Sequence, residues 1–194
     1  MLDWEQRFDI ALGTAKGLAY LHEECLEWVL HCDVKPHNIL LDCDYKPKVA
    51  DFGLSKLLDR DGSGNSEFTR ARGTRGYMAP EWLFVNLPIT SKVDVYSYGV
   101  VMLEMITGRS ATGANQIAVS EGRLDSWVRE KIIASDGKNE WVEEILDSTV
   151  DGDYNMKRME ILIKVALQCC EEDKDARPTM SQVVNRLLHV EEDA

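Results

Sequence analysis

The sequence predicts one compact domain of the α+β class that is mostly α-helical. Apolar residues recur at helical spacing in five segments, and two short runs around a turn carry strand signals. A chain of 194 residues with 44% hydrophobic content is long enough for one good core but short for two ordinary domains. No internal repeat or low-complexity tract divides the sequence.

The first helix is predicted from Trp4 to His22. Asp3 has the side chain of a helix cap, and Gln6 follows three residues later, as in a capping box. Gly13 and Gly17 inside the helix each weaken it by roughly 1 kcal/mol relative to Ala, a cost usually accepted where another element packs closely. We therefore expect a second element against this face.

A polar loop from His31 precedes two predicted strands, which end near Phe52. Their residues are Ile39 to Leu41 and Lys48 to Ala50, and the intervening segment Cys43 to Pro47 has turn composition. The segment from Arg60 to Arg72 is rich in Gly, Ser, Asn and charge, with little to bury. It is a candidate regulatory segment.

The most apolar helix follows Pro88, with Thr90 or Ser91 as its cap and Gly108 at its end. It is apolar nearly all round, which predicts the centre of the core. The stretch 110–122 reads as a loop. Three amphipathic helices are predicted after it, at about Leu124 to Ile133, Asn155 to Cys170 and Thr179 to Val190.

Composition excludes several classes of protein. The net charge of -12 with scattered acids disfavours a nucleic-acid partner, and basic partners fit better than polyanions. Five cysteines without a pairing framework suit reduced thiols in a cytosolic compartment. The acidic start does not resemble a signal peptide, and the apolar run Val95 to Ile106 is too short for a bilayer, so we expect no membrane contact by this chain.

The informative chemistry lies in the loops around the two strands. Asp33, Lys35 and Asn38 occupy one short loop, and Asp51-Phe52-Gly53 follows the second strand directly. Phosphoryl transfer needs a carboxylate that orients a hydroxyl group, oxygen ligands for magnesium and positive charge against phosphate oxygens. All three are present in order.

These motifs resemble the catalytic loop and the magnesium-binding tripeptide of the protein kinase family. The resemblance implies ATP and Mg²⁺ as cofactors. It also implies Asp33 as catalytic base, Lys35 as the contact to the transferring phosphoryl group, Asn38 and Asp51 as magnesium ligands, and Leu40 as the floor of the adenine pocket. The fold class then becomes a kinase-like C-terminal lobe, with residues 1–190 as the domain and 191–194 as a tail.

The segment Gly73 to Glu81 resembles the substrate-facing end of a kinase activation segment. By this resemblance Thr74 hydrogen-bonds Asp33 and Lys35. Glu81 and Arg177 resemble the buried ion pair of the family, and Asp94 resembles the carboxylate that braces the catalytic-loop backbone. These last roles are structural.

The finer resemblance is to plant receptor-like serine/threonine kinases, particularly the group with lectin-type extracellular domains. Lys35 in the stretch Asp33 to Pro36 is the form similar to kinases that act on Ser and Thr hydroxyls, so the expected partner is a protein with such an acceptor. In such receptors this lobe lies on the cytoplasmic side of the plasma membrane, while the chain as written reads as soluble.

Two departures from the family pattern stand out. Cys32 occupies the position where most kinases carry the arginine that binds a phosphate on the activation segment, as in the so-called non-RD kinases. Ser66 and Thr69 are candidate phosphorylation sites or plain polar loop residues. The sequence also contains no glycine-rich phosphate loop and no strand lysine, so we expect an absent N-terminal lobe, an exposed apolar surface around Leu40 and Val49, and little activity of this fragment alone.

Three other functions compete with the kinase interpretation. A truncated lobe could act as a binding or docking module through Thr74 and the late helices. A metal hydrolase could use Asp33, Asn38 and Asp51, but that leaves Lys35 and Thr74 unexplained. A zinc site from neighbouring His and Cys residues matches no common spacing.

Overall fold

A computed structural model describes residues 2–58, 72–83, 89–112, 123–135, 140–149 and 154–192. Helix α1 spans Trp4–Ala19 and begins with the predicted capping box. The Gln6 amide N–H donates to Asp3 Oδ1 at 2.8 Å, and the Asp3 N–H donates to Gln6 Oε1 at 3.0 Å. The predicted end at His22 falls inside a π-helical turn, Tyr20–Glu24, that continues α1.

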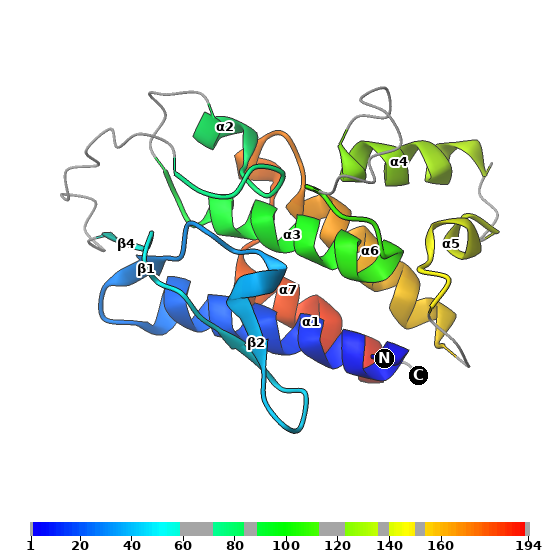
Figure 1. The fold of residues 1–194 in the computed structure, drawn as a ribbon, viewed down its shortest axis with the longest axis horizontal. Coiled ribbons are helices and arrows are strands. Elements are labelled where there is room, and N and C mark those ends of the chain that lie inside the picture. The colour runs from blue at the N-terminus through cyan, green and yellow to red at the C-terminus, as the bar shows by residue number, and fades with distance from the viewer. Residues whose placement is uncertain are drawn as a thin grey trace.

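Helix α3, Lys92–Thr107, forms the centre of the core, as its apolar sequence predicts (Figure 1). It begins after Ser91, which makes no side-chain cap bond, while Thr90 Oγ1 accepts from the Lys92 N–H at 3.3 Å. It ends at Gly108, whose φ of +66° is the left-handed conformation of a helix cap. Both predicted helix ends are therefore confirmed.

Two further helices pack on this centre. Helix α6, Met156–Cys169, lies against α3, and helix α7, Met180–Glu192, lies against α1 (Figure 1). A Cβ on Gly99 of α3 would come within 2.7 Å of the Ala166 carbonyl oxygen of α6, so the two backbones approach closely there. Helix α7 runs to Glu192, two residues into the predicted tail at 191–194, and the division into domain and tail stays a prediction.

Three shorter helices complete the helical part. Helix α4, Leu124–Ala134, matches its prediction. Helices α2, Pro80–Leu83, and α5, Glu140–Ile145, were not predicted. Each is too short to show a helical period in the sequence.

The strands form two antiparallel pairs. β2, Ile39–Leu41, pairs with β3, Pro47–Val49, as predicted, with Ile39 opposite Val49. β1, Trp28–Leu30, pairs with β4, Lys56–Leu58, with Leu30 opposite Lys56. The second pair was missed, because three-residue strands in separate loops carry little pattern. The structure is thus mostly helical with little sheet, which confirms the predicted fold class.

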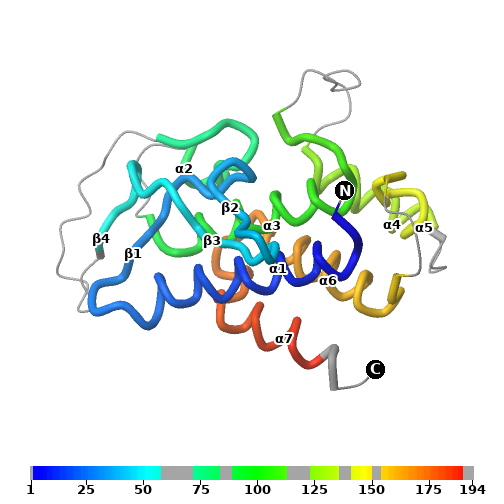
Figure 2. Tube along the Cα trace, turned by 60° about the horizontal axis from the view of Figure 1, so that its bottom comes forward, coloured from blue at the N-terminus to red at the C-terminus, as the bar shows by residue number. Residues whose placement is uncertain are grey.

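The β2–β3 hairpin lies against α1 (Figure 2). The contact falls on the face that carries Gly13 and Gly17, where close packing was predicted. A Cβ on Gly13 would meet Pro47 Cγ at 2.6 Å, whereas one on Gly17 would meet Val49 Cγ2 at 3.4 Å, an ordinary contact. The expectation that an element packs on this face is confirmed.

The expected apolar surface is present in part. Leu40 is 56% exposed, and Leu41 of the same strand is also exposed, while Val49 is half-buried over α1. No helix within the described ranges is long and apolar enough to cross a membrane.

Candidate active site

The carboxylate of Asp33 is the centre of a dense hydrogen-bond cluster. Its Oδ1 accepts from the Thr74 backbone N–H at 3.0 Å and from Thr74 Oγ1 at 2.7 Å. Its Oδ2 accepts from Lys35 Nζ at 2.6 Å and from Asn38 Nδ2 at 3.2 Å. Lys35 Nζ also donates to Thr74 Oγ1 at 3.0 Å. The structure therefore makes the contacts of Thr74 that the sequence predicts.

This cluster keeps Asp33 ionised. Burial alone raises the pKa of the Asp33 carboxyl, but the hydrogen bonds from Lys35, Thr74 and Asn38 and the charge of Lys35 outweigh it, so the pKa is lowered. The carboxylate is 8% exposed. It can hold a hydroxyl group by accepting its hydrogen bond.

Asp94 at the start of α3 fixes the backbone of the catalytic loop, which we define as residues 31–38. Its Oδ2 accepts from the His31 N–H at 2.7 Å, and its Oδ1 accepts from the Cys32 N–H at 2.8 Å. The ring Nε2 of His22 lies 2.9 Å from the same Oδ2. All of these groups but Cys32 are buried. These contacts support the bracing role that the sequence suggested for Asp94.

Cys32 adopts a left-handed backbone conformation, with φ at +68°. This conformation is uncommon outside Gly, Asn and Asp, and residues held in it occur often at functional sites. Burial, followed by the nearby charge of Asp94, raises the pKa of the Cys32 thiol to about 12. The thiol is therefore protonated at neutral pH.

His31 connects the catalytic loop with the segment that carries Asp51. Its Nδ1 accepts from the Asp33 N–H at 3.2 Å, and its Nε2 lies 2.8 Å from the Ala50 carbonyl oxygen, as in the neutral tautomer with hydrogen on Nε2. Its ring also lies 5.1 Å from that of Phe52. The two motifs found in the sequence are thus joined through one buried imidazole.

Asp51 is exposed and lies directly after Ala50, whose N–H donates to the Asn38 carbonyl oxygen at 2.9 Å. Its φ of +63° is also left-handed, and its Oδ1 accepts from the Gly53 N–H at 3.2 Å. Both side-chain hydrogen bonds of Asn38 come from Nδ2. Among the described residues, the Asn38 oxygen Oδ1 makes no hydrogen bond, so a lone pair is open to a ligand.

The donor chemistry of this pair fits magnesium. Mg²⁺ takes hard oxygen ligands and is usually held by one or two carboxylates together with substrate phosphates. Within the described ranges no group of three or more His, Cys, Asp or Glu could hold a metal ion without such help. Asn38 and Asp51 would supply the protein ligands.

The substrate-facing loop, which we define as residues 73–79, is held on both sides. Tyr77 Oη donates to Glu104 Oε2 at 2.6 Å, and the other oxygen of Glu104 accepts from the Ala111 N–H at 2.7 Å. A cavity of about 10 Å³ between this loop and the catalytic loop is lined by Cys32, Asp33, Thr74 and Tyr77 among others. Such a volume holds at most about one water molecule, so the two loops pack closely.

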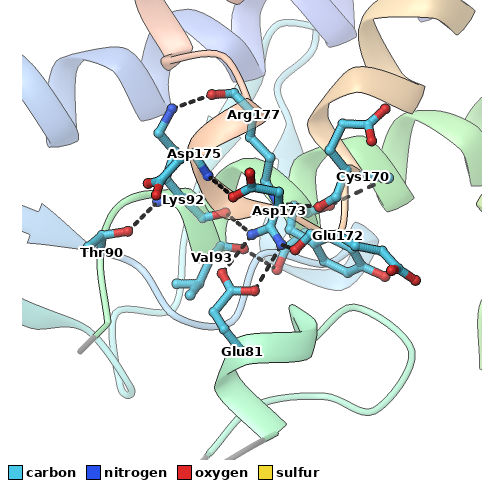
Figure 3. A network of polar contacts seen from close by, with 12 residues as sticks. Glu81, Thr90, Lys92, Val93, Cys170, Glu172, Asp173, Asp175 and Arg177 are labelled. Carbon is cyan, nitrogen blue, oxygen red and sulfur yellow. Dashed lines mark hydrogen bonds and ion pairs between the residues drawn. The ribbon is translucent and has the colours of Figure 1, made fainter. Parts of the chain in front are cut away.

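Arg177 anchors the end of this segment, as Figure 3 shows. Its Nη1 and Nη2 donate to the two carboxylate oxygens of Glu81 at 2.6 and 2.8 Å, in a bidentate pair. The guanidinium also donates to the carbonyl oxygens of Glu171 and Lys92, and it is 2% exposed. The predicted Glu81 and Arg177 side chains are therefore brought together in the interior.

Some predicted site residues lie elsewhere. Ser66 and Thr69 fall outside the described residues. Leu40 lies exposed on β2, and its place in an adenine pocket stays a prediction. Sequence reasoning missed His22 and Glu104, because a lone His or Glu inside an apolar pattern does not reveal its partner. His31 was recognised as part of the loop, but its bonds to Asp33 and Ala50 were not predicted.

The family model described as "Protein kinase domain" matches residues 2–188. The Zea mays protein named as receptor protein kinase ZmPK1 is 50% identical over 99% of this chain. Two Arabidopsis thaliana proteins named G-type lectin S-receptor-like serine/threonine-protein kinases, SD2-2 and SD2-5, are 45% and 47% identical over 99% and 96% of it. The chain spans about a quarter of the length of these curated relatives, covering 24%, 24% and 22% of them.

Proposed function

Because this chain belongs to the protein kinase family, we propose that it forms the acceptor side of a serine/threonine kinase that transfers the γ-phosphoryl group of ATP to protein hydroxyls. The observation that carries the proposal is the Asp33 carboxylate, which is ionised, braced from α3 and bonded to Thr74 of the substrate-facing loop. The relatives are named as plant receptor-like kinases, which supports a place on the cytoplasmic side of the plasma membrane in a parent receptor.

In this proposal Asp33 orients the acceptor hydroxyl and accepts its proton. Lys35 lies 2.6 Å from Asp33 Oδ2, so its charge is fixed where a transferring phosphoryl group would meet the hydroxyl. Thr74 positions the substrate-facing loop by its two bonds to the same carboxylate oxygen. Positioning of this kind supplies most of the catalysis in phosphoryl transfer.

ATP and Mg²⁺ complete the proposed site. Bound magnesium neutralises charge on the phosphate oxygens. Asn38 Oδ1 and the Asp51 carboxylate are the residues that would hold it. The sequence of the 194 residues contains no glycine-rich phosphate loop or strand lysine, so we expect the isolated chain to transfer no detectable phosphate.

The proposal is tested by fusing this chain to the nucleotide-binding N-terminal lobe of a plant receptor-like kinase. We expect Mg²⁺-dependent transfer of labelled phosphate to a peptide library containing Ser and Thr. Asp33→Asn should lower the rate by roughly 10²- to 10⁴-fold, the usual contribution of a positioned base. Arg186→Ala is the matched control and should leave the rate unchanged, because Arg186 is an exposed residue of α7 whose side chain contacts Gln168 of α6 and no residue of the site.

Three outcomes would contradict the proposal. Transfer that survives in Asp33→Asn would remove the assigned base. Hydrolysis of ATP without a protein acceptor would indicate a metal hydrolase. A folded fusion that binds peptides but transfers no phosphate would favour the docking module.

A further inference from the structure

The acceptor side of the site carries two arginines that have no charged partner among the described residues. Arg72 and Arg75 are exposed and flank Gly73 and Thr74. Among the described residues neither guanidinium makes a hydrogen bond, an ion pair or a ring contact. Every other described arginine makes at least one, for example Arg177 with Glu81 and Arg109 over the ring of Trp127.

The backbone of Arg75 is held in a turn next to Thr74, which bonds Asp33. The Tyr77 N–H donates to the Thr74 carbonyl oxygen at 3.2 Å, which closes a turn with Arg75 and Gly76 at its corners. Gly76 has φ at +94°, as a type II turn requires at its third residue. A Cβ there would lie 2.7 Å from the Ala111 carbonyl oxygen, so this corner of the turn cannot move inward.

The distance from this turn to the reacting position is short. Thr74 Oγ1 lies 2.7 Å from Asp33 Oδ1, and the next Cα along the chain is about 3.8 Å from that of Thr74. A peptide whose hydroxyl reaches Asp33 must therefore place neighbouring side chains within reach of Arg75, and Arg72 lies on the other side of the same threonine.

The described carboxylates of the site do not cancel these two charges. The Asp33 charge is compensated by Lys35 at 2.6 Å. Both oxygens of Glu104 are bonded, to Tyr77 Oη and the Ala111 N–H. The other acidic residues within the described ranges form no ion pair with either guanidinium.

We propose that Arg72 and Arg75 select acceptor sequences with an acidic residue within two positions of the phosphorylated Ser or Thr. This inference deepens the proposed kinase function and rests on it. It also opposes the expectation from the net charge of -12, which favours basic partners. Local charge next to the acceptor decides the preference, because specificity across an interface comes from complementary charges in contact.

The test uses three nine-residue peptides that share one Ser and differ only in flanking Asp, Lys or Gln. Their dissociation constants are measured with the 194-residue chain, and their KM values with the fusion described above. We expect the Asp peptide to bind roughly 3- to 10-fold more tightly than the Gln peptide, since each exposed charge pair changes an affinity by roughly 1.5- to 5-fold. The Lys peptide should bind more weakly than the Gln peptide.

Charge reversal provides the decisive comparison. Arg75→Glu should invert the order of the Asp and Lys peptides relative to the Gln peptide, which serves as the reference within each variant. Arg75→Gln should reduce the differences among the dissociation constants of the three peptides. Arg186→Glu on α7 changes the net charge by the same amount at a residue that contacts Gln168 and not the site, and it should preserve the order.

Equal affinity for all three peptides, or a preference for Asp that persists in Arg75→Glu, would overturn the inference. Failure of the proposed function looks different. If no peptide is phosphorylated while the Asp peptide still binds best, the kinase proposal fails and the arginine surface stands. If phosphorylation proceeds with equal KM values, the kinase proposal stands and the selection by Arg72 and Arg75 fails.

Discussion

The acceptor side and the metal side of the candidate site differ in how far the chain completes them. Asp33 on the acceptor side is 8% exposed and accepts four hydrogen bonds from three residues. Asp51 on the metal side is exposed, and its carboxylate accepts one described hydrogen bond, from Gly53. The acceptor side is therefore built by contacts within this chain, while the proposed metal side has few described contacts of its own.

The two sides also rest on different supports. The catalytic loop is tied to the helical core through Asp94, and the substrate-facing loop is tied to it through Glu81 and Arg177. The β2–β3 hairpin, which leads to Asp51, has the close contact of Pro47 with Gly13. We infer that damage to the core should disorder the acceptor side, while damage at the hairpin should affect mainly the metal side.

Loss of Arg177 is expected to have the largest effect. Arg177→Ala leaves Glu81 without its bidentate partner in the interior, and removing one member of a buried pair commonly costs about 3 to 5 kcal/mol. Thermal and urea unfolding measure the loss of stability. Arg186→Ala is the control, and an unchanged melting temperature in Arg177→Ala would contradict the importance of this anchor.

The second-largest expected effect is a difference in reactivity between a cysteine of the catalytic loop and a cysteine of the hairpin. The pKa of Cys32 is about 12, and its thiol is largely covered, whereas Cys43 in the hairpin turn is exposed. Because only the thiolate reacts, we expect iodoacetamide at pH 8 to modify Cys43 at least about 100-fold faster than Cys32. Mass spectrometry of the peptides measures both rates. Comparable rates would show that the acceptor side opens readily.

A pair of glycine substitutions tests the attachment of the hairpin. Gly13→Ala should cost about 1 to 3 kcal/mol, because its Cβ has no room beside Pro47. Gly17→Ala is the matched control one turn later in the same helix, where a Cβ fits, and it should gain up to about 1 kcal/mol in helix propensity. Equal effects of the two changes on urea unfolding would show that the close contact has no energetic weight.

Much of this arrangement was predictable from local sequence. The capping box at Asp3, the glycine end of α3 and the hairpin at Ile39 follow from signals a few residues long. The motif residues Asp33 and Thr74 were assigned by family resemblance, and their contact is present. Their catalytic roles stay predictions.

The remainder depended on tertiary contacts that no short pattern encodes. In the sequence, 25 residues separate the end of β1 from the start of β4. The two strands nevertheless pair, with Leu30 opposite Lys56. The approach of His22 to Asp94 depends on the π-helical turn at the end of α1, which turns the ring toward α3. Likewise, Arg72 and Arg75 can be recognised as a possible binding surface only when the contacts of the other arginines are known.

The pH dependence of Asp33 is the smallest expected effect and the most direct test of how the acceptor side is held. Because the pKa of Asp33 is lowered in the folded protein, its carboxylate contributes stability above the unfolded pKa of about 3.9. This contribution should disappear as the pH falls through the lower, folded pKa. The stability difference between wild type and Asp33→Asn, measured by urea unfolding, should therefore stay constant from pH 7 to 5 and shrink below about pH 4. A difference that instead grows toward low pH would mean that the carboxylate is held by burial rather than by Lys35, Thr74 and Asn38, and the contrast with Asp51 would lose its physical basis.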